Sequence, residues 1–283
     1  MIGASEVSAI VGQNAFKTSD EVLQSLWQKH NKFSFALNVG QTKKDKEKEA
    51  ATKDTTSKVA IDKAIEMSKS AVLSSETTKI IAAAKDVVMA SPSLTDEDKK
   101  LAIDHLQSNV HTSFGTKNEE VTITDKKSDV VSEEKNELIR IDDYFELRVH
   151  ETFKHEYTIV GRVDCIEKNS VTGHIKLVEV KNRVNKLFRT LRNYEEVQIQ
   201  VYLQLLGLKE AKLVEQYNDE VFTIDNIAKW ADEKFQVDII DKVVVFCSKL
   251  DGLLTNEALA AEYKQTLPAV TAPVYPYRNY RQR

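Results

Sequence analysis

Two carboxylates and a lysine occupy positions in this sequence from which they could act together on one substrate. Asp164 lies in one stretch of alternating residues, and Glu179 lies two residues before Lys181 in the next stretch. A turn at residues 170–173 (SVTG) predicts a β-hairpin that places Asp164 opposite Glu179 and Arg162 opposite Lys181. Because side chains alternate between the faces of a strand, Glu179 and Lys181 share one face.

This arrangement favours a metal-dependent hydrolase. Two carboxylates directly opposite each other repel unless a cation lies between them, and a hard divalent ion such as Mg²⁺ prefers oxygen ligands. The backbone carbonyl of Val180 would add a third ligand oxygen to those of Asp164 and Glu179. A bound metal ion neutralises a phosphodiester and activates water, while Lys181 would orient that water or stabilise the developing charge. The alternative is a structural salt-bridged hairpin, which the apolar flank Leu177-Val178 disfavours.

The residues that follow the hairpin are basic and then helical. Residues 182–193 contain no acidic side chain, and a local basic patch can bind phosphates even in an acidic protein. Residues 193–206 predict an amphipathic helix with Gln198 and Tyr202 on one face. We expect Gln198 to support the site and Tyr202 to contact DNA, although an exposed amide pair remains the alternative. The basic residues expected to bind DNA are Arg183, Lys186, Arg189 and Arg192.

The remaining pattern predicts an α/β (α+β) fold with a central mixed β-sheet flanked by helices. Helices are predicted at residues 3–12, with Ser5 as cap, and at residues 21–30, 193–206 and 256–263. Strands are predicted at residues 138–149, 157–167, 175–181, 212–217 and 242–247 (KVVVFC).

We expect one domain over residues 1–272, with a helical insertion and a short tail. The insertion, about residues 41–108, is rich in lysine, and residues 93–97 (SLTDE) predict the start of a further helix within it. Its charged run at residues 43–49 indicates a solvated face or disorder, with a DNA path or an oligomer contact as the alternative. The tail, residues 273–283, carries prolines, tyrosines and arginines and is expected to be poorly ordered.

Composition excludes several classes of protein. The 283 residues are 41% hydrophobic and 30% charged, with a net charge of −4 and two cysteines. Two cysteines cannot build a disulfide framework or a four-thiolate metal site. The sequence has no apolar run of the roughly 20 residues that a membrane helix needs, and no signal-peptide pattern. We therefore expect an intracellular, cytoplasmic protein without a membrane partner.

Four motifs together resemble a known nuclease family. Asp164, Glu179-Val180-Lys181 and the following helix, which contains Gln198-Ile199-Gln200, resemble the motifs of the PD-(D/E)XK superfamily. Residues 2–12 (IGASEVSAIVG) and 114–119 (FGTKNE) are similar to the N-terminal helix and the G-x-x-x-E helix of its YqaJ-type viral recombinase, or lambda-exonuclease-like, branch. The iron–sulfur branch of the superfamily is disfavoured, because two cysteines cannot supply four thiolates.

The resemblance implies a restriction-endonuclease-like fold and a Mg²⁺-dependent exonuclease, with Mn²⁺ as a second candidate metal. Such an enzyme degrades one strand of double-stranded DNA from the 5′ end in recombination or repair. By position, Asp164 and Glu179 would be metal ligands, Lys181 would orient water, Glu119 would add a carboxylate, and Ser5 would lie near the 5′ phosphate. A single-strand annealing protein, a second copy of the chain and a virus-encoded origin in a host cell are further expectations from this resemblance.

Two departures from the family and two other functions stay open. The arginine that usually precedes the N-terminal motif has no counterpart before Met1-Ile2, so either further residues supply it or end recognition differs. The lysine-rich helical segment is longer than the usual connection. A structure-specific or restriction-type endonuclease shares the Asp…Glu-x-Lys core, and a non-catalytic DNA-binding protein could retain the same fold.

Overall fold

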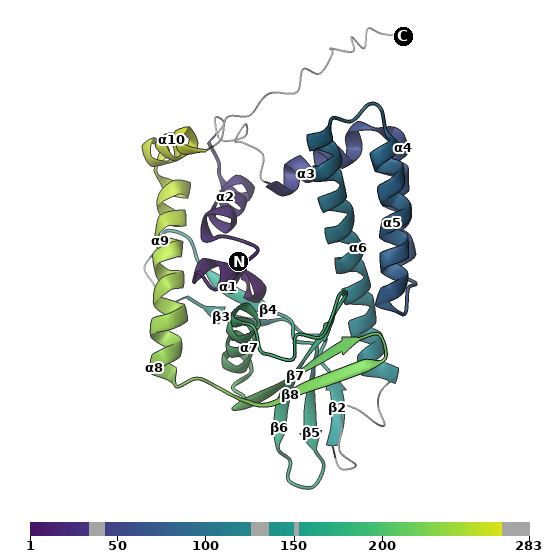
Figure 1. Ribbon diagram of the computed structural model, residues 1–283. Coiled ribbons are helices and arrows are strands. Elements are labelled where there is room, and N and C mark those ends of the chain that lie inside the picture. The colour runs from purple at the N-terminus through teal and green to yellow at the C-terminus, as the bar shows by residue number, and fades with distance from the viewer. Residues whose placement is uncertain (34–42, 126–135, 150–152, 268–283) are drawn as a thin grey trace, which may run out of the picture.

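The computed structural model describes residues 1–33, 43–125, 136–149 and 153–267, and Figure 1 shows their arrangement. The predicted tail at 273–283 lies outside these residues. The helices are α1 (Ala4–Ile10), α2 (Ser19–His30), α3 (Lys43–Lys53), α4 (Thr55–Ser68), α5 (Ser74–Ala90), α6 (Asp96–Asp125), α7 (Asn193–Leu206), α8 (Asp232–Phe235), α9 (Asp241–Thr255) and α10 (Glu257–Thr266). The strands are β1 (Ile2–Gly3), β2 (Asn136–Arg140), β3 (Phe145–Arg148), β4 (Thr158–Gly161), β5 (Cys165–Asn169), β6 (Ile175–Asn182), β7 (Glu210–Tyr217) and β8 (Glu220–Ala228).

Within the described residues these strands form two mixed sheets flanked by helices, which confirms the α+β class. The larger sheet has the order β2-β5-β6-β7-β8, and the smaller sheet has the order β1-β4-β3. In the larger sheet β6 pairs in parallel with β7, while the other adjacent strands of the sheet pair antiparallel. The parallel pair is joined through α7, a crossover that lays this helix against the sheet.

The helices of the predicted insertion have a hydrophobic core of their own. Buried side chains of α3, α4, α5 and α6 cluster together, among them Ile61, Val88 and Leu106. Helix α6 begins where residues 93–97 predict a helix start, and Thr95 Oγ1 accepts a hydrogen bond from the backbone of Asp98 at its first turn. The same helix continues past residue 108 and reaches the larger sheet, where it contacts β6 (Figure 1). The helical insertion and the sheet therefore share one continuous helix.

Three predicted strands and one predicted helix cap are wrong, each for a physical reason. The predicted strands at 138–149 and 157–167 are each divided, because their halves pair in different sheets. Residues 242–247 belong to α9, where Val243, Phe246, Cys247 and Leu250 are buried at helical spacing while Val245 is 70% exposed. Ser5 does not cap α1. The cap is Gly3, whose N–H donates to Glu6 Oε2 at 3.1 Å.

The main core lies between the sheets and the helices α1, α2, α7 and α9. It joins Leu177 and Leu213 of the larger sheet with Ile199 and Leu203 of α7, and Trp27 of α2 is fully buried within it. The opposite face of the larger sheet holds a small cluster around Cys165, Val178 and Val180. Both faces of β6 are therefore covered, as expected for a central strand.

None of the helices in the described ranges is both long enough and apolar enough to cross a membrane.

Candidate metal centre and nucleic-acid interface

The β5–β6 hairpin has the predicted register. Cys165 pairs with Val178 and Ile166 with Leu177, and Gly173 closes the turn by donating its N–H to Asn169 O at 2.8 Å. Gly173 has φ of 71°, a conformation that glycine adopts without strain. The predicted pairing of Arg162 with Lys181 is wrong. Strand pairing ends at Cys165, because residues 162–164 carry the chain from the smaller sheet to the larger one.

The hairpin brings the two predicted carboxylates to the same end of β6. Asp164 Oδ2 accepts a hydrogen bond from the backbone N–H of Val180 at 2.9 Å, so this carboxylate reaches across to β6 beside Glu179. Glu179 is almost fully buried, and its Oε1 pairs with Lys181 Nζ at 2.6 Å. The lysine ammonium and the glutamate thus share one face of the strand, as the alternation predicts. The ammonium also offsets part of the cost of burying the carboxylate.

The oxygen atoms at this point fit a hard divalent cation. The N–H and C=O of a strand residue point to the same side, so the carbonyl of Val180 points toward Asp164 as its N–H does. Two carboxylates and one carbonyl are the ligands that Mg²⁺ prefers. Among the described residues no three His, Cys, Asp or Glu side chains gather as a metal site. Glu119, the predicted third carboxylate, lies in α6, which contacts β6, but its side chain lies outside the described part of the structure.

Helix α7 places the predicted Gln198 and Tyr202 beside this centre. Gln198 Nε2 donates to the Tyr202 hydroxyl oxygen at 2.9 Å. Burial raises the pKa of Tyr202, and the negative charge of Glu179 raises it further, so the phenol stays neutral. Tyr202 is only 6% exposed, which argues against the predicted direct contact with DNA. Its position instead indicates that it packs the floor of the site.

Tyr202 packs so closely on Gly161 that no side chain fits there. A Cβ atom built on Gly161 would lie 2.6 Å from Tyr202 Cε1 and 3.1 Å from the Cβ of Ala4. The start of α1 therefore lies against the same tyrosine. Ser5, the next residue of that helix, is exposed.

We expect Gly161→Ala to lower the free energy of unfolding by about 1–3 kcal/mol, because the methyl group overpacks against the Tyr202 ring. Urea denaturation would measure this change. Gly115→Ala is the matched control, since a Cβ atom at Gly115 would have no neighbour within 4 Å and alanine favours a helix more than glycine does. Equal stability of Gly161→Ala and wild type would contradict this packing.

The structure gives Arg183 a structural role in place of the predicted contact with DNA. Its Nη1 lies 2.7 Å from Glu195 Oε1, and its Nε donates to Glu215 Oε1 at 2.7 Å. Both glutamates are buried, and the Arg183 side chain is 10% exposed. Burial alone would lower the pKa of Arg183, but bonding to Glu195 and the charge of Glu215 raise it. We therefore exclude Arg183 from the proposed DNA-binding residues.

The other predicted basic residues remain on the surface. Lys186, Arg189 and Arg192 are exposed, and the Arg192 guanidinium lies over the ring of Phe188 at 4.5 Å. Arg189 Nη2 lies 3.2 Å from Glu220, and both side chains are largely exposed. An exposed ion pair of this kind contributes little stability, so a phosphate can replace the carboxylate.

The sequence patterns did not indicate the carboxylates that form ion pairs with Arg183. Glu215 lies inside β7 and is fully buried, and it also accepts the backbone N–H of Arg189 at 2.7 Å. The signal in the sequence was its place on the strand face that carries Ala211 and Leu213, two residues after Leu213. A buried carboxylate there requires a cation from a neighbouring segment.

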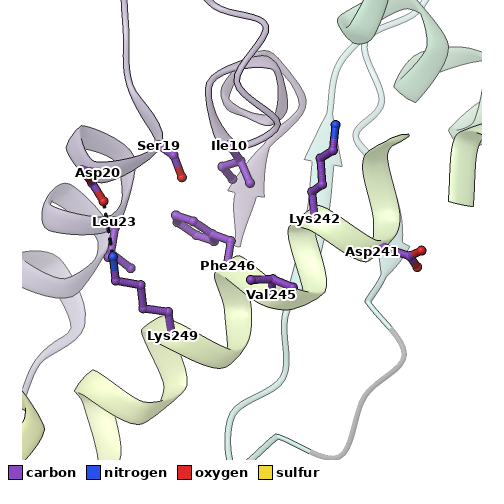
Figure 2. A pocket seen from close by; sticks show the side chains of 9 residues that line it. All are labelled: Ile10, Ser19, Asp20, Leu23, Asp241, Lys242, Val245, Phe246 and Lys249. Atoms are coloured by element: carbon purple, nitrogen blue, oxygen red, sulfur yellow. Dashed lines mark hydrogen bonds and ion pairs between the residues drawn. The ribbon is translucent and has the colours of Figure 1, made fainter. Parts of the chain in front are cut away.

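A groove of about 390 Å³ lies between helices α1, α2 and α9 (Figure 2). Ile10, Leu23 and Phe246 form its apolar lining, and Lys249 pairs with Asp20 across it at 3.3 Å. No predicted site residue lines this groove. It therefore contributes nothing to the proposed chemistry.

No protein-family model matches the chain, and a comparison with curated proteins finds no match. A solved structure described as "Crystal structure of SSO0001" is similar to it, with 20% sequence identity and a TM-score of 0.35. The match covers 54% of this chain and 66% of that chain, so this chain spans just under two thirds of its neighbour's length. A likeness at this TM-score carries no argument about function.

Proposed function

We propose that this protein is a metal-dependent deoxyribonuclease that acts as an exonuclease on linear double-stranded DNA, from the 5′ end. The observation that carries the proposal is the hydrogen bond from Val180 N–H to Asp164 Oδ2 at 2.9 Å. This bond holds the carboxylate that precedes β5 beside Glu179, directly next to the Glu179–Lys181 pair. Phosphodiester hydrolysis needs such a combination of oxygen ligands and an adjacent cation.

Each residue of the site has a definite task in this proposal. Asp164, Glu179 and the carbonyl of Val180 would hold Mg²⁺, or Mn²⁺ in its place, which supplies charge neutralisation and activation of water. Lys181 Nζ would hold the attacking water or offset the charge that develops on the phosphate oxygens. Gln198 and Tyr202 support these groups from α7. Glu119 stays a candidate fourth ligand by its position in α6.

The proposed direction and the exonuclease mode rest on the family resemblance of the four motifs. One strand-labelled linear duplex, with and without a 5′ phosphate, tests both features. We expect Mg²⁺-dependent release of nucleotides from the 5′-terminated strand and no cleavage of covalently closed circular duplex. Cleavage of the circle would show an endonuclease. DNA binding without turnover in Mg²⁺ or Mn²⁺ would show a non-catalytic DNA-binding protein.

We expect Arg189→Ala combined with Arg192→Ala to weaken DNA binding and to flatten its salt dependence. The logarithm of the binding constant falls linearly with the logarithm of the salt concentration, and each lost phosphate contact makes this slope less steep by about 0.9. Fluorescence anisotropy of a labelled duplex at several salt concentrations would measure the slope. Lys168→Ala with Lys209→Ala is the matched control, because both lysines are exposed near the turn end of the larger sheet. An unchanged slope in the arginine variant would remove Arg189 and Arg192 from the binding surface.

A further inference from the structure

A large aromatic side chain stands in solvent beside helix α7, the helix that also carries Gln198 and Tyr202. Phe16, in the segment between α1 and α2, is 81% exposed. Exposing a phenylalanine gives up the favourable free energy of burying it. A single exposed apolar side chain is common, so what lies around the ring decides whether it marks a binding surface.

The segment that carries Phe16 is held in place on several sides. Asn14 Oδ1 accepts the backbone N–H groups of Phe16 at 2.8 Å and of Lys17 at 3.1 Å. Lys17 Nζ also pairs with Glu6 of α1 at 2.8 Å. These bonds fix the backbone on both sides of the ring without burying the ring itself. A pre-positioned aromatic ring loses little conformational freedom when a ligand stacks on it.

Contacts with α7 connect this ring to the metal centre. The ring centroids of Phe16 and Tyr194 lie 5.8 Å apart in an edge-to-face arrangement, and Asn193 Nδ2 donates to Gln13 Oε1 at 3.1 Å. Burial and the charge of Glu195 raise the pKa of Tyr194 while Arg183 lowers it, which places this tyrosine beside the Arg183–Glu195 pair. Arg183 follows Lys181 by two residues, at the carboxyl end of β6.

Exposed basic residues lie close in the chain to Tyr194, the aromatic partner of Phe16. Arg192, at the start of α7, is exposed two residues before Tyr194, and Lys186 is exposed on the segment that precedes it. An aromatic ring next to exposed cations is the arrangement by which proteins hold unpaired nucleic-acid bases, because every base presents a face for stacking.

We propose that Phe16 stacks on a base at the open end of the DNA substrate and so guides one strand toward the carboxylates. This inference rests on the proposed nuclease function. It adds a residue that recognises ends, since a terminal or unpaired base has a free face whereas a base inside a closed duplex does not.

Phe16→Ala and Phe16→Trp test the proposal, with Tyr144→Ala as the matched control because Tyr144 is another exposed aromatic, at 71%. Binding is measured in EDTA, where no cleavage occurs, on a short linear duplex with one unpaired terminal base and on a closed circular duplex. We expect Phe16→Ala to weaken binding to the linear duplex at least about fivefold, from stacking contributions of ~1–3 kcal/mol per base. Phe16→Trp and Tyr144→Ala should bind as wild type, and binding to the circle should not change in any variant. 2-Aminopurine at the terminal position should report stacking by wild type and lose that signal with Phe16→Ala.

The outcomes separate this inference from the function on which it rests. If wild type binds DNA and releases nucleotides in Mg²⁺, but Phe16→Ala binds the linear duplex equally well, only the stacking proposal is overturned. If wild type neither binds nor cleaves DNA, the proposed function itself fails. Sedimentation of wild type and Phe16→Ala excludes a third outcome, since loss of an assembled state in the variant would show that Phe16 contacts another copy of the chain.

Discussion

Asp164→Asn, Glu179→Gln and Lys181→Met should each lower Mg²⁺-dependent release of nucleotides from linear duplex DNA by at least about 100-fold. Asparagine and glutamine keep the shape of the carboxylates but remove the charge that binds a divalent cation. Asparagine can still accept the Val180 N–H, so the hairpin should stay intact. Methionine keeps the length of Lys181 but cannot hold water or offset charge. Initial rates at saturating DNA would measure the effect.

The matched controls are an exposed lysine on β5, the strand next to β6, and an exposed glutamate on β3 of the smaller sheet. Lys168→Met lies on β5 and Glu146→Gln lies on β3, and both side chains face solvent. These controls should keep wild-type rates, and all five variants should show wild-type unfolding midpoints within a few degrees. Near-normal rates in the three site variants would remove these residues from the chemistry.

Arg183→Met should destabilise the protein by about 3–5 kcal/mol, the largest stability effect that we expect. The substitution leaves the buried carboxylates of Glu195 and Glu215 without the guanidinium that pairs with both. Urea denaturation, followed by far-ultraviolet circular dichroism, would measure the shift of the midpoint at constant slope. Adding Glu215→Gln to Arg183→Met should restore part of the loss, because it removes one unpaired charge.

Arg192→Met is the control for Arg183→Met, because Arg192 is exposed and lies over the same Phe188 ring. Its stability should lie within about 0.5 kcal/mol of wild type. If both arginine variants were equally stable, Arg183 would not have the structural role that its contacts indicate. The pair of variants thus distinguishes a basic residue that stabilises the fold from one that is exposed on the surface.

The sequence was sufficient to predict the hairpin and α7, because both are specified by local signals. The turn at 170–173 and the alternation on either side determine the register of β5 and β6. The amphipathic spacing of α7 and the glycine after it, with φ of 65°, determine the bounds of that helix. That register predicts that Asp164 lies near Glu179, and the hydrogen bond from Val180 N–H to Asp164 Oδ2 holds it there although strand pairing ends at Cys165.

Local sequence patterns could not predict contacts between segments that are far apart in the chain. The break at residues 162–164 depends on β4 pairing with β1 and β3, which belong to the smaller sheet. Residues 242–247 have the apolar run of a strand, but packing of α9 against α2 and α1 makes the segment helical. Arg183 was assigned to DNA because its neighbours are basic, whereas its partners Glu195 and Glu215 come from α7 and β7.

Manganese soaked into crystals of the protein would test the metal centre most directly, through its anomalous scattering. We expect an anomalous peak from manganese about 2.0–2.2 Å from carboxylate oxygens of both Asp164 and Glu179, next to the carbonyl of Val180. Glu179→Gln should lose that peak. An empty position between these residues in fully soaked wild-type crystals, or carboxylates that point away from each other, would contradict the account.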